Sequence, residues 1–482
     1  MPSNAAANAV KWLRCLVIGI FALASLYVLA CIYFQRSHPR PLLGPASKTA
    51  FAPAWPAGFL WGTATAAHQV EGGNAFNDWA RFEQQPGKIA HGDQSGAAAG
   101  HWSKVAEDIA LMRELGANSY RFSIEWSRVE PTEGAWDNAA WQHYADEVAQ
   151  LNAAGVEPVV TLLHFTLPAW LADRGGATAP DFPERFGRFA AEAARRLGPQ
   201  VRWWCTVNEP QVQMYQGYVI GIWPPGVKDN AQAVRAFEGL LRAHGKAALA
   251  LRQGDADAQI GVASNMIYFE PSNRWNLLEQ IVGNMVSNGF NWSFYESIAK
   301  GRALFSMPGF PGLDVPLPEL TGTIDWVGIN YYRRNLVTFA PGSPGMVDIH
   351  PGPGTLTDAG IEIYPEGLLA LLRESSKRYP LPIMITENGV ADSAGVHRSM
   401  FIRQHAYAVK QAIEEGIDVR GLFHWSLMDN FEWAEGFGAR FGLYRLDRAT
   451  MARTPAAGSE EFRRLAPRGP VGSRERPSAP RH

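Results

Sequence analysis

Cysteine is scarce in this chain of 482 residues, which contains only three. Three cysteines are too few for a disulfide framework, so the fold must depend on a packed core. Charged residues are also few, at 19%, and they nearly balance, with 44 Lys and Arg against 46 Asp and Glu. This composition, together with 46% hydrophobic residues, excludes a disordered chain and a coiled coil.

Both ends of the chain carry an excess of basic over acidic residues. Residues 1–50 contain five Lys and Arg and no acid, and residues 467–482 contain four Arg and one Glu. The long middle part therefore carries a net negative charge, which argues against a partner with a phosphate backbone. We expect no nucleic acid among the partners.

One long hydrophobic run lies near the N-terminus. Residues 15–34 (CLVIGIFALASLYVLACIYF) contain no charge, and a helix of this length spans about 30 Å, the thickness of a bilayer's hydrocarbon core. The run is longer than a typical secretory signal and lacks a small-residue cleavage site at its end, which favours an uncleaved transmembrane anchor over a cleaved signal. A lipoprotein modified at Cys31 is an alternative that the following Ile-Tyr-Phe disfavours.

Basic residues flank this run on both sides, so the positive-inside rule hardly decides its orientation. The short N-terminal tail, residues 1–14, favours a folded part on the extracytoplasmic side. Residues 35–54 are rich in proline and predict a linker, and residues 467–482 predict a disordered tail. Residues 55–466 then form one large domain, tied to a lipid bilayer through residues 15–34.

Short apolar runs alternate with amphipathic stretches throughout this domain. About eight such pairs predict an α/β fold, a (β/α)₈ barrel with insertions. A doubly wound sheet is the alternative, but the chain has neither a G-x-G-x-x-G loop nor a Walker motif. The expected strands are Phe59–Ala67, Ser119–Ile124, Val156–His164, Trp203–Asn208, Ile260–Tyr268, Trp326–Tyr331, Ile383–Thr386 and Gly421–Ser426.

Polar and aromatic residues follow the expected strand ends, where the chemistry of such barrels takes place. Glu209 and Glu387 end the fourth and seventh strands and would face each other across the barrel mouth. Hydrolysis of a glycoside with retained configuration needs two carboxyl groups about 5–5.5 Å apart, one a proton donor and one a nucleophile. We expect Arg121 and Tyr332 to keep Glu387 ionised and oriented, while Glu209 keeps its proton.

Several segments resemble family 1 glycoside hydrolases, in the same order along residues 51–466. The resemblance is carried by FLWGTATAAHQVEGG (59–73), YRFSIEWSRVEP (120–131), TVNEP (206–210), ITENG (385–389), WSLMDNFEWAEGF (425–437) and RFGLY (440–444). It implies a retaining double displacement, with Glu209 as the acid/base and Glu387 as the nucleophile. It implies neither a metal nor an organic cofactor. The sugar-binding and supporting residues that it implies are Gln69, His164, Asn208, Asn330, Tyr332, Trp425, Glu432, Trp433, Phe441 and Arg121.

Some positions depart from the family pattern. Phe165 follows His164 where many members have Trp, which makes that wall of the pocket smaller. Glu125 is an additional carboxylate near the mouth, and we expect it to pair with Arg128. Trp223 and Trp292 fall in expected loops, where either could line the aglycone site.

The resemblance implies a β-glucosidase that could also act on β-galactosides or β-fucosides. The substrate would be a small β-glycoside or a glycolipid. A membrane-associated transglycosylase acting on glycolipids is the alternative, since the same glycosyl-enzyme can pass its sugar to a hydroxyl instead of water. A sugar-binding protein without activity is disfavoured because Glu209 and Glu387 are both present.

Overall fold

The computed structural model describes residues 4–467. The tail predicted to be disordered lies, apart from Pro467, outside the described residues.

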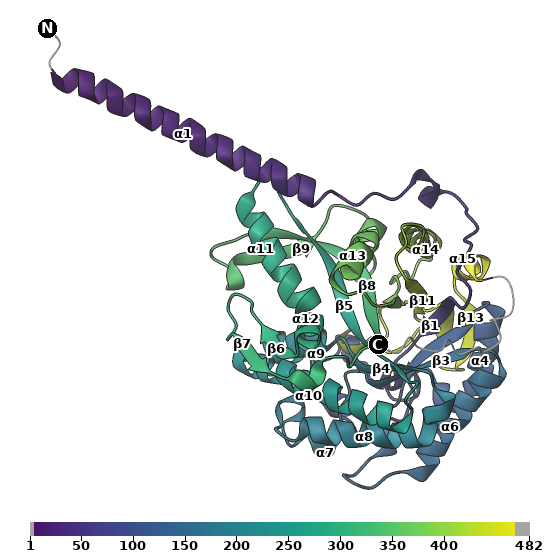
Figure 1. The fold of residues 1–482 in the computed structure, drawn as a ribbon. Coiled ribbons are helices and arrows are strands. Elements are labelled where there is room, and N and C mark those ends of the chain that lie inside the picture. The colour runs from purple at the N-terminus through teal and green to yellow at the C-terminus, as the bar shows by residue number, and fades with distance from the viewer. Residues whose placement is uncertain (1–3, 468–482) are drawn as a thin grey trace.

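Eight parallel strands close into a barrel, as predicted (Figure 1). Each strand pairs with the next along the chain, and pairing of β11 with β1 and of β10 with β8 completes the ring. All eight lie where the sequence pattern placed them. Their bounds are β1 (Leu60–Ala64), β2 (Ser119–Ser123), β3 (Glu157–Leu163), β4 (Trp203–Asn208), β5 (Gln259–Pro271), β8 (Trp326–Phe339), β10 (Ile383–Asn388) and β11 (Val419–Trp425).

Helices surround the barrel and bury their apolar faces against it (Figure 1). Helix α6 (Asn138–Ala153), for example, buries Trp141, Tyr144 and Val148 on one face. Asp137 caps its start by accepting from the backbone N–H groups of Ala139 and Ala140. The long helices are α4 (Val105–Glu114), α6 (Asn138–Ala153), α8 (Phe182–Leu197), α10 (Asn230–Gly254), α11 (Leu277–Ser287), α12 (Ser293–Lys300), α13 (Pro365–Arg378) and α14 (Arg398–Glu414). Shorter ones are α2 (Ala67–Val70), α3 (Asp78–Phe82), α5 (Trp126–Val129), α7 (Ala169–Ala172), α9 (Pro210–Met214) and α15 (Ser459–Leu465).

Strands β5 and β8 continue beyond the barrel at their carboxyl ends. Tyr268–Pro271 pair with residues 334–337, and β9 (Val347–Pro351) adds an antiparallel strand to β8. Residues 341–360 are rich in glycine and proline, yet they include this strand at the barrel rim. Two small hairpins, β6 (Arg302–Phe305) with β7 (Leu313–Pro316) and β12 (Tyr444–Asp447) with β13 (Ala452–Pro455), lie outside the barrel.

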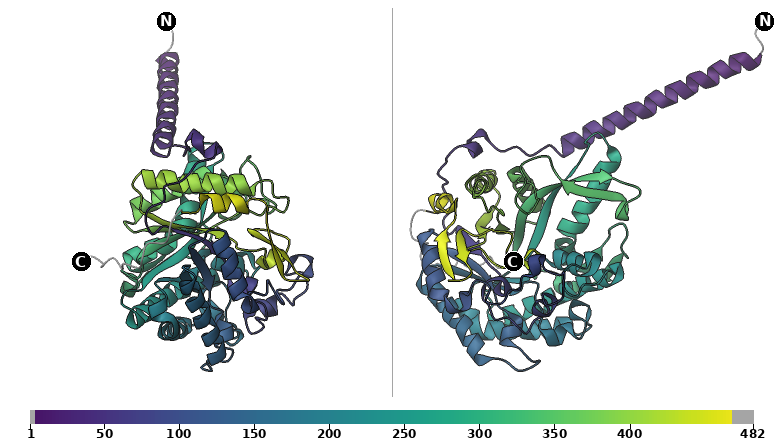
Figure 2. Two further views of the ribbon diagram at one scale, coloured as in Figure 1. Left: turned by 90° about the vertical axis from the view of Figure 1, so that its right-hand side faces the viewer. Right: turned by 180° about the vertical axis from the view of Figure 1, so that it is seen from behind.

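The N-terminal hydrophobic run forms part of one long helix, α1 (Asn4–Ser37), which projects away from the barrel (Figure 2). The helix is longer than the apolar run, so most of the expected tail 1–14 and the start of the expected linker are helical. Among the described residues, α1 alone is long and apolar enough to cross a membrane, and its most apolar stretch is almost entirely exposed. A signal sequence would meet the same criteria.

Candidate active site

The two candidate catalytic carboxylates stand at irregular strand ends. The register of β4 against β5 shifts between Cys205 and Asn208, and that of β10 against β8 shifts between Ile385 and Glu387. Glu209 itself adopts a left-handed backbone conformation (φ 45°) at the turn into α9. Such bulges and turns re-aim side chains, and here they bring both carboxylates to the carboxyl end of the barrel.

Glu387 lies between a cation and a phenol. Arg121 Nη1 donates to Glu387 Oε1 at 2.7 Å, and Tyr332 Oη donates to Oε2 at 2.6 Å. Both donors stabilise the ionised carboxylate, and because each binds a different oxygen they also fix its orientation. The arrangement places Arg121 and Tyr332 beside Glu387, where the sequence analysis expected them.

Glu209 receives only neutral amide donors. Asn330 Nδ2 donates to Glu209 Oε1 at 2.8 Å, and Asn265 Nδ2 donates to the same oxygen at 3.0 Å. Oε2 is therefore the oxygen left to carry a proton. Asn265 was not predicted as a site residue, although it is a polar residue in a mostly apolar stretch of β5, close to the point where the strand leaves the barrel.

A continuous network joins the surroundings of the two carboxylates. Asn208 Oδ1 accepts from Arg121 Nη2 at 2.7 Å and from Asn330 Nδ2 at 3.0 Å. The Asn208 amide lies 3.1 Å from His164 Nε2, and Thr386 Oγ1 donates to Asn330 Oδ1 at 2.6 Å. Since every member is buried, the network holds the two carboxylates in one fixed arrangement.

The two carboxylates differ in the charges and donors that oppose the effect of burial on their pKa values. Burial, with the negative charge of Glu387 nearby, raises the pKa of Glu209 to about 8. Burial also raises the pKa of Glu387, but there Arg121 and Tyr332 oppose it. The proton shared by this pair is therefore held by Glu209, because a full positive charge stabilises the anion at Glu387.

Three of the predicted sugar-binding residues form one cluster. Gln69 Nε2 donates to Glu432 Oε2 at 3.2 Å and to the carbonyl of Phe431 at 2.8 Å, while Trp425 Nε1 lies 3.4 Å from the same Glu432 oxygen. Burial raises the pKa of Glu432 to about 8. Among the described residues, Gln69 Oε1 and His164 Nδ1 are buried without a hydrogen-bond partner, so both are available to a ligand.

Aromatic rings line the same region. Trp433 lies nearly parallel to His164, with ring centroids 6.1 Å apart, and packs edge-on against Phe165 at 5.2 Å. Trp223 packs against both Phe165 and Trp433, so it belongs to this wall. Two further predicted residues, Tyr332 and Phe441, contact edge-to-face with centroids 6.1 Å apart. Flat apolar surfaces of this kind suit the ring face of a sugar.

Two expectations were wrong. Glu125 does not pair with Arg128; its carboxylate accepts from Ser127 and from Thr166 Oγ1 at 2.9 Å, while Arg128 binds Glu71. Trp292 does not lie in a loop near the site. It is buried in a helical turn, residues 288–292, between α11 and α12, with the guanidinium of Arg378 over its ring.

Comparison with known proteins gives one consistent result. Residues 52–466 match the model of glycosyl hydrolase family 1. The chain is 34% identical over 423 residues to beta-glucosidase A of Thermotoga maritima, covering 83% of this chain and 94% of the relative. It is 30% identical to a beta-galactosidase of Pyrococcus woesei, with the same coverage.

Solved structures agree with the sequence relatives. A beta-glucosidase from Thermotoga maritima in complex with glucoimidazole superposes with a TM-score of 0.79 at 31% identity, over 85% of this chain and 97% of that one. The chain therefore belongs to glycosyl hydrolase family 1.

Proposed function

We propose that this protein is a retaining β-glycosidase that removes terminal, non-reducing β-D-glucosyl residues by double displacement. The observation that carries the proposal is the asymmetry of the two buried carboxylates. Glu387 is bound by a cation and a phenol, whereas Glu209 is bound by two amides on one oxygen. A retaining glycosidase needs this pair of roles, one ionised nucleophile and one protonated acid.

In the first step, a Glu387 oxygen attacks the anomeric carbon while Glu209 gives its proton to the glycosidic oxygen. The carbon–oxygen bond to the aglycone breaks, the aglycone leaves as an alcohol, and the sugar remains as an ester of Glu387. Glu209 is now ionised and accepts a proton from water. That water attacks the same carbon, the ester bond breaks, and Glu387 leaves as a carboxylate, so the sugar is released with its original configuration.

The remaining predicted residues would hold the sugar. Gln69 Oε1 and His164 Nδ1 are both buried without a partner among the described residues. Gln69 Oε1 would accept from a sugar hydroxyl, whereas His164 Nδ1 would donate to one, because the neutral ring already accepts from the Asn208 amide at Nε2. Glu432 would accept from two adjacent hydroxyls, and Asn208 would contact the hydroxyl next to the reacting carbon. Trp425 would form the floor under the ring, with Trp433 and Phe441 closing the pocket around it.

Glucose and galactose are both reasonable sugars for this pocket. They differ in the orientation of one hydroxyl, and a carboxylate such as Glu432 can accept from either orientation. Relatives named as beta-glucosidase and as beta-galactosidase match the chain at similar identity. We therefore expect activity on both sugars, with the β-glucoside preferred.

We further propose that α1 anchors the enzyme in a membrane as a single span, with the barrel on the extracytoplasmic side. The helix is long enough, uncharged between residues 15 and 34, and exposed on nearly all of its surface. Exposure of so many apolar side chains to water is unfavourable, and insertion of the helix into a bilayer removes these side chains from water. Anchoring would bring the enzyme close to glycolipids as well as to soluble glycosides.

The test uses the full chain, purified in detergent, with p-nitrophenyl β-D-glucoside and β-D-galactoside. We expect nitrophenol release by the wild type, loss of it in Glu387→Ala, and partial rescue of that variant by azide, which replaces the missing nucleophile. The matched control is Glu238→Ala, which removes a surface carboxylate paired with Arg242. No release on either sugar by folded protein would contradict the proposal; transfer of sugar to added glycolipid in place of hydrolysis would favour the transglycosylase.

A further inference from the structure

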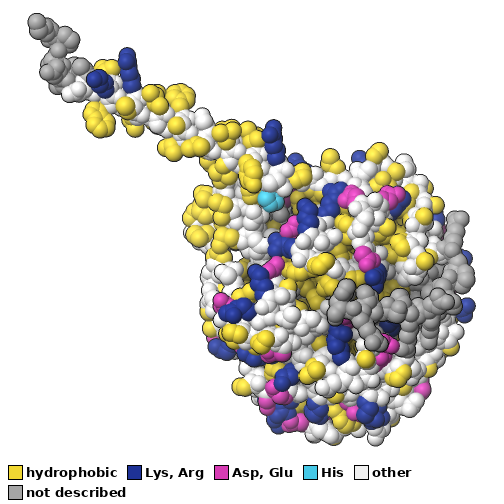
Figure 3. Space-filling model, viewed as in Figure 1, with side chains coloured by type: hydrophobic (Ala, Val, Ile, Leu, Met, Phe, Trp, Pro, Cys, Tyr) yellow, Lys and Arg dark blue, Asp and Glu magenta, His cyan; other side chains and the backbone are white. Residues whose placement is uncertain are grey.

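Helix α11 carries an exposed apolar row beside α1. Trp275, just before the helix, and Leu278, Ile281 and Met285 within it are 51%, 49%, 52% and 41% exposed. Their spacing of three and four residues places them on one face. The opposite face, which includes Val282 and Val286, is buried against the barrel. We call these four residues the α11 row; Figure 3 shows hydrophobic side chains gathered there, at the base of α1.

Helix α1 is joined to the start of this row by hydrogen bonds. Tyr27 Oη donates to the carbonyl of Trp275 at 2.7 Å, and Cys31 Sγ lies 3.3 Å from the same oxygen. One turn further along α1, Gln35 Nε2 contacts the carbonyl of Arg274 at 3.5 Å. These contacts fix where along α1 the barrel is attached.

The point of attachment lies inside the uncharged run. Tyr27 is seven residues before Phe34, the last residue of that run, which corresponds to about 10 Å along a helix. Cys31 is three residues before it, about 4.5 Å. If residues 15–34 fill the hydrocarbon core, Trp275 lies several ångströms below the upper boundary of that core. The start of α11, directly after Trp275, then lies at the membrane surface, the depth at which interfacial helices bury their apolar faces.

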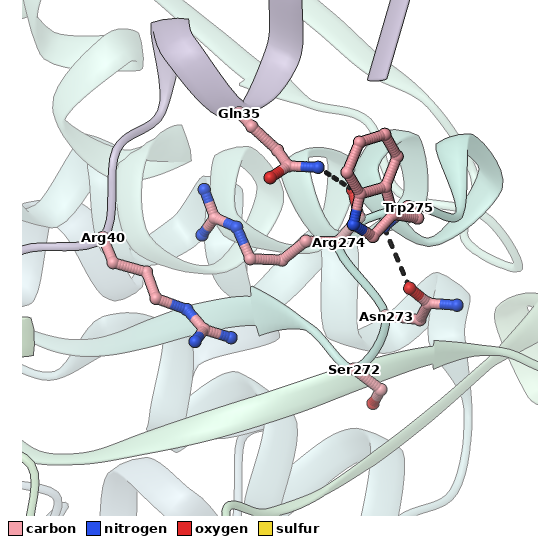
Figure 4. A pocket seen from close by; sticks show the side chains of 6 residues that line it. All are labelled: Gln35, Arg40, Ser272, Asn273, Arg274 and Trp275. Carbon is pink, nitrogen blue, oxygen red and sulfur yellow. Dashed lines mark hydrogen bonds between the residues drawn. The ribbon is translucent and has the colours of Figure 1, made fainter. Parts of the chain in front are cut away.

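A polar layer lies directly above this level. A pocket of about 520 Å³ is lined by Gln35, Arg40, Ser272, Asn273, Arg274 and Trp275 (Figure 4). Arg40 and Arg274 both bind Glu270 Oε1, at 2.8 and 3.1 Å, and Arg36 ends the uncharged run nearby. Basic side chains next to the end of a membrane-spanning helix lie at the level of the lipid phosphates, which they attract.

We propose that the α11 row is embedded in the bilayer surface next to α1, so that the barrel rests on the membrane through two elements. The inference rests on the proposed anchoring of α1. A lipid bilayer is the occupant that fits, because the row continues the exposed apolar surface of α1 and the cations of the pocket lie just above it. The row is thus a second membrane contact, separate from the transmembrane span.

This contact also positions the catalytic site. Asn265, which donates to Glu209, lies six residues before Pro271 at the end of β5. At about 3.3 Å per residue, this part of β5 is about 20 Å long, and it ends four residues before Trp275, the first residue of the α11 row. The carboxyl end of the barrel, where substrate enters, is therefore held next to the lipid surface.

The test measures depth at single cysteines in the full chain reconstituted into phosphatidylcholine–phosphatidylglycerol vesicles. Cys15→Ser and Cys31→Ser remove the two cysteines of α1, and Cys205 is buried in β4. An environment-sensitive fluorophore is attached at Ile281→Cys, at Leu23→Cys on α1, and at Leu249→Cys on α10. Leu249 is the matched control because it is an equally exposed leucine on a helix away from α1, at 57%.

We expect nitroxide-labelled lipids to quench the fluorophore at positions 23 and 281 at least threefold more than at position 249. Quenching at 23 but not at 281 would overturn the inference and leave the anchor intact. No quenching at 23 would overturn the anchor itself, and the inference with it. Unchanged hydrolysis of p-nitrophenyl β-D-glucoside by each labelled variant shows that the barrel is folded.

Discussion

Removal of the Asn265 amide tests the assignment of Glu209 as the proton donor. Asn265 Nδ2 donates to Glu209 Oε1 at 3.0 Å, and this contact stabilises the ionised form of the acid. The variant Asn265→Ala therefore raises the pKa of Glu209 above its value of about 8. A proton donor acts while it is protonated, so activity is lost as the pH rises through this pKa, and the basic limb of kcat/KM moves to higher pH.

The size of the shift follows from the strength of the bond. A hydrogen bond to a charged group contributes about 1.5–3 kcal/mol, and one pKa unit corresponds to about 1.36 kcal/mol. Asn330 remains on the same oxygen, and Asn265 is only partly buried, so water replaces some of the lost interaction. We therefore expect the lower end of this range, an upward shift of about one unit.

The assay is kcat/KM for an alkyl β-D-glucoside between pH 5 and 10, because an alkoxide leaving group depends on protonation by the enzyme. Asn335→Ala is the matched control: Asn335 lies on the rim segment of β8, where its backbone pairs with Phe269, five residues beyond Asn330. An equal loss of activity at every pH, or a basic limb that moves down, would refute the assignment of Glu209.

Three further substitutions address other parts of the molecule. Tyr332→Phe removes one of the two donors to Glu387, and we expect kcat/KM to fall about 10- to 150-fold. Because the phenol lowers the pKa of Glu387, its removal should also move the acidic limb of kcat/KM to higher pH. Glu432→Gln weakens sugar binding, and we expect a loss of about 10-fold or more in kcat/KM for glucoside and galactoside, with nitrophenyl substrates as the readout. His101 is buried between Asp108 and Glu147. Burial alone would lower the pKa of His101, but the two carboxylates raise it to about 10. The ion pairing therefore stabilises the fold fully below about pH 6.5, and this stabilisation is lost as the pH rises through 10. His101→Gln should therefore lower the free energy of unfolding by about 3 kcal/mol at pH 6 and by less at pH 10, measured by urea denaturation; an equal loss at both pH values would contradict the ion pairing.

The barrel could be predicted from the sequence because its strands are short, apolar and regularly spaced. All eight follow the alternation of apolar runs with amphipathic helices, and even the Asp137 cap is visible in the chain. The predicted strands Ile260–Tyr268 and Trp326–Tyr331 were too short, since β5 ends at Pro271 and β8 at Phe339. Extension of β5 and β8 beyond the barrel depends on their pairing with each other and with β9, a contact between segments far apart in sequence.

Residues of the site could be proposed where a motif or a strand end marked them, but not where only packing decides. Asn265 lies in a strand that carries no recognisable motif, and its polar side chain in an apolar stretch was too weak a signal to assign it to the site. Glu125 and Arg128 are three residues apart, a spacing that favours pairing on a helix. Arg128 turns instead to Glu71, and Glu125 caps the turn as an acceptor from Ser127. Such choices depend on partners that folding brings from other strands.

The different roles of the two catalytic carboxylates arise from their partners and not from their own positions. Glu209 directly follows β4 and Glu387 lies near the end of β10, each at a register shift, and both are buried. What separates them is that Arg121, on β2, donates to Glu387 and to Asn208 but not to Glu209. One guanidinium thus selects which carboxylate is ionised, while its second nitrogen holds the asparagine that precedes the other. The division between nucleophile and acid is therefore built by the strand order of the barrel, which places β2 against β3 and β1 and lets one side chain reach across to β10 and β4.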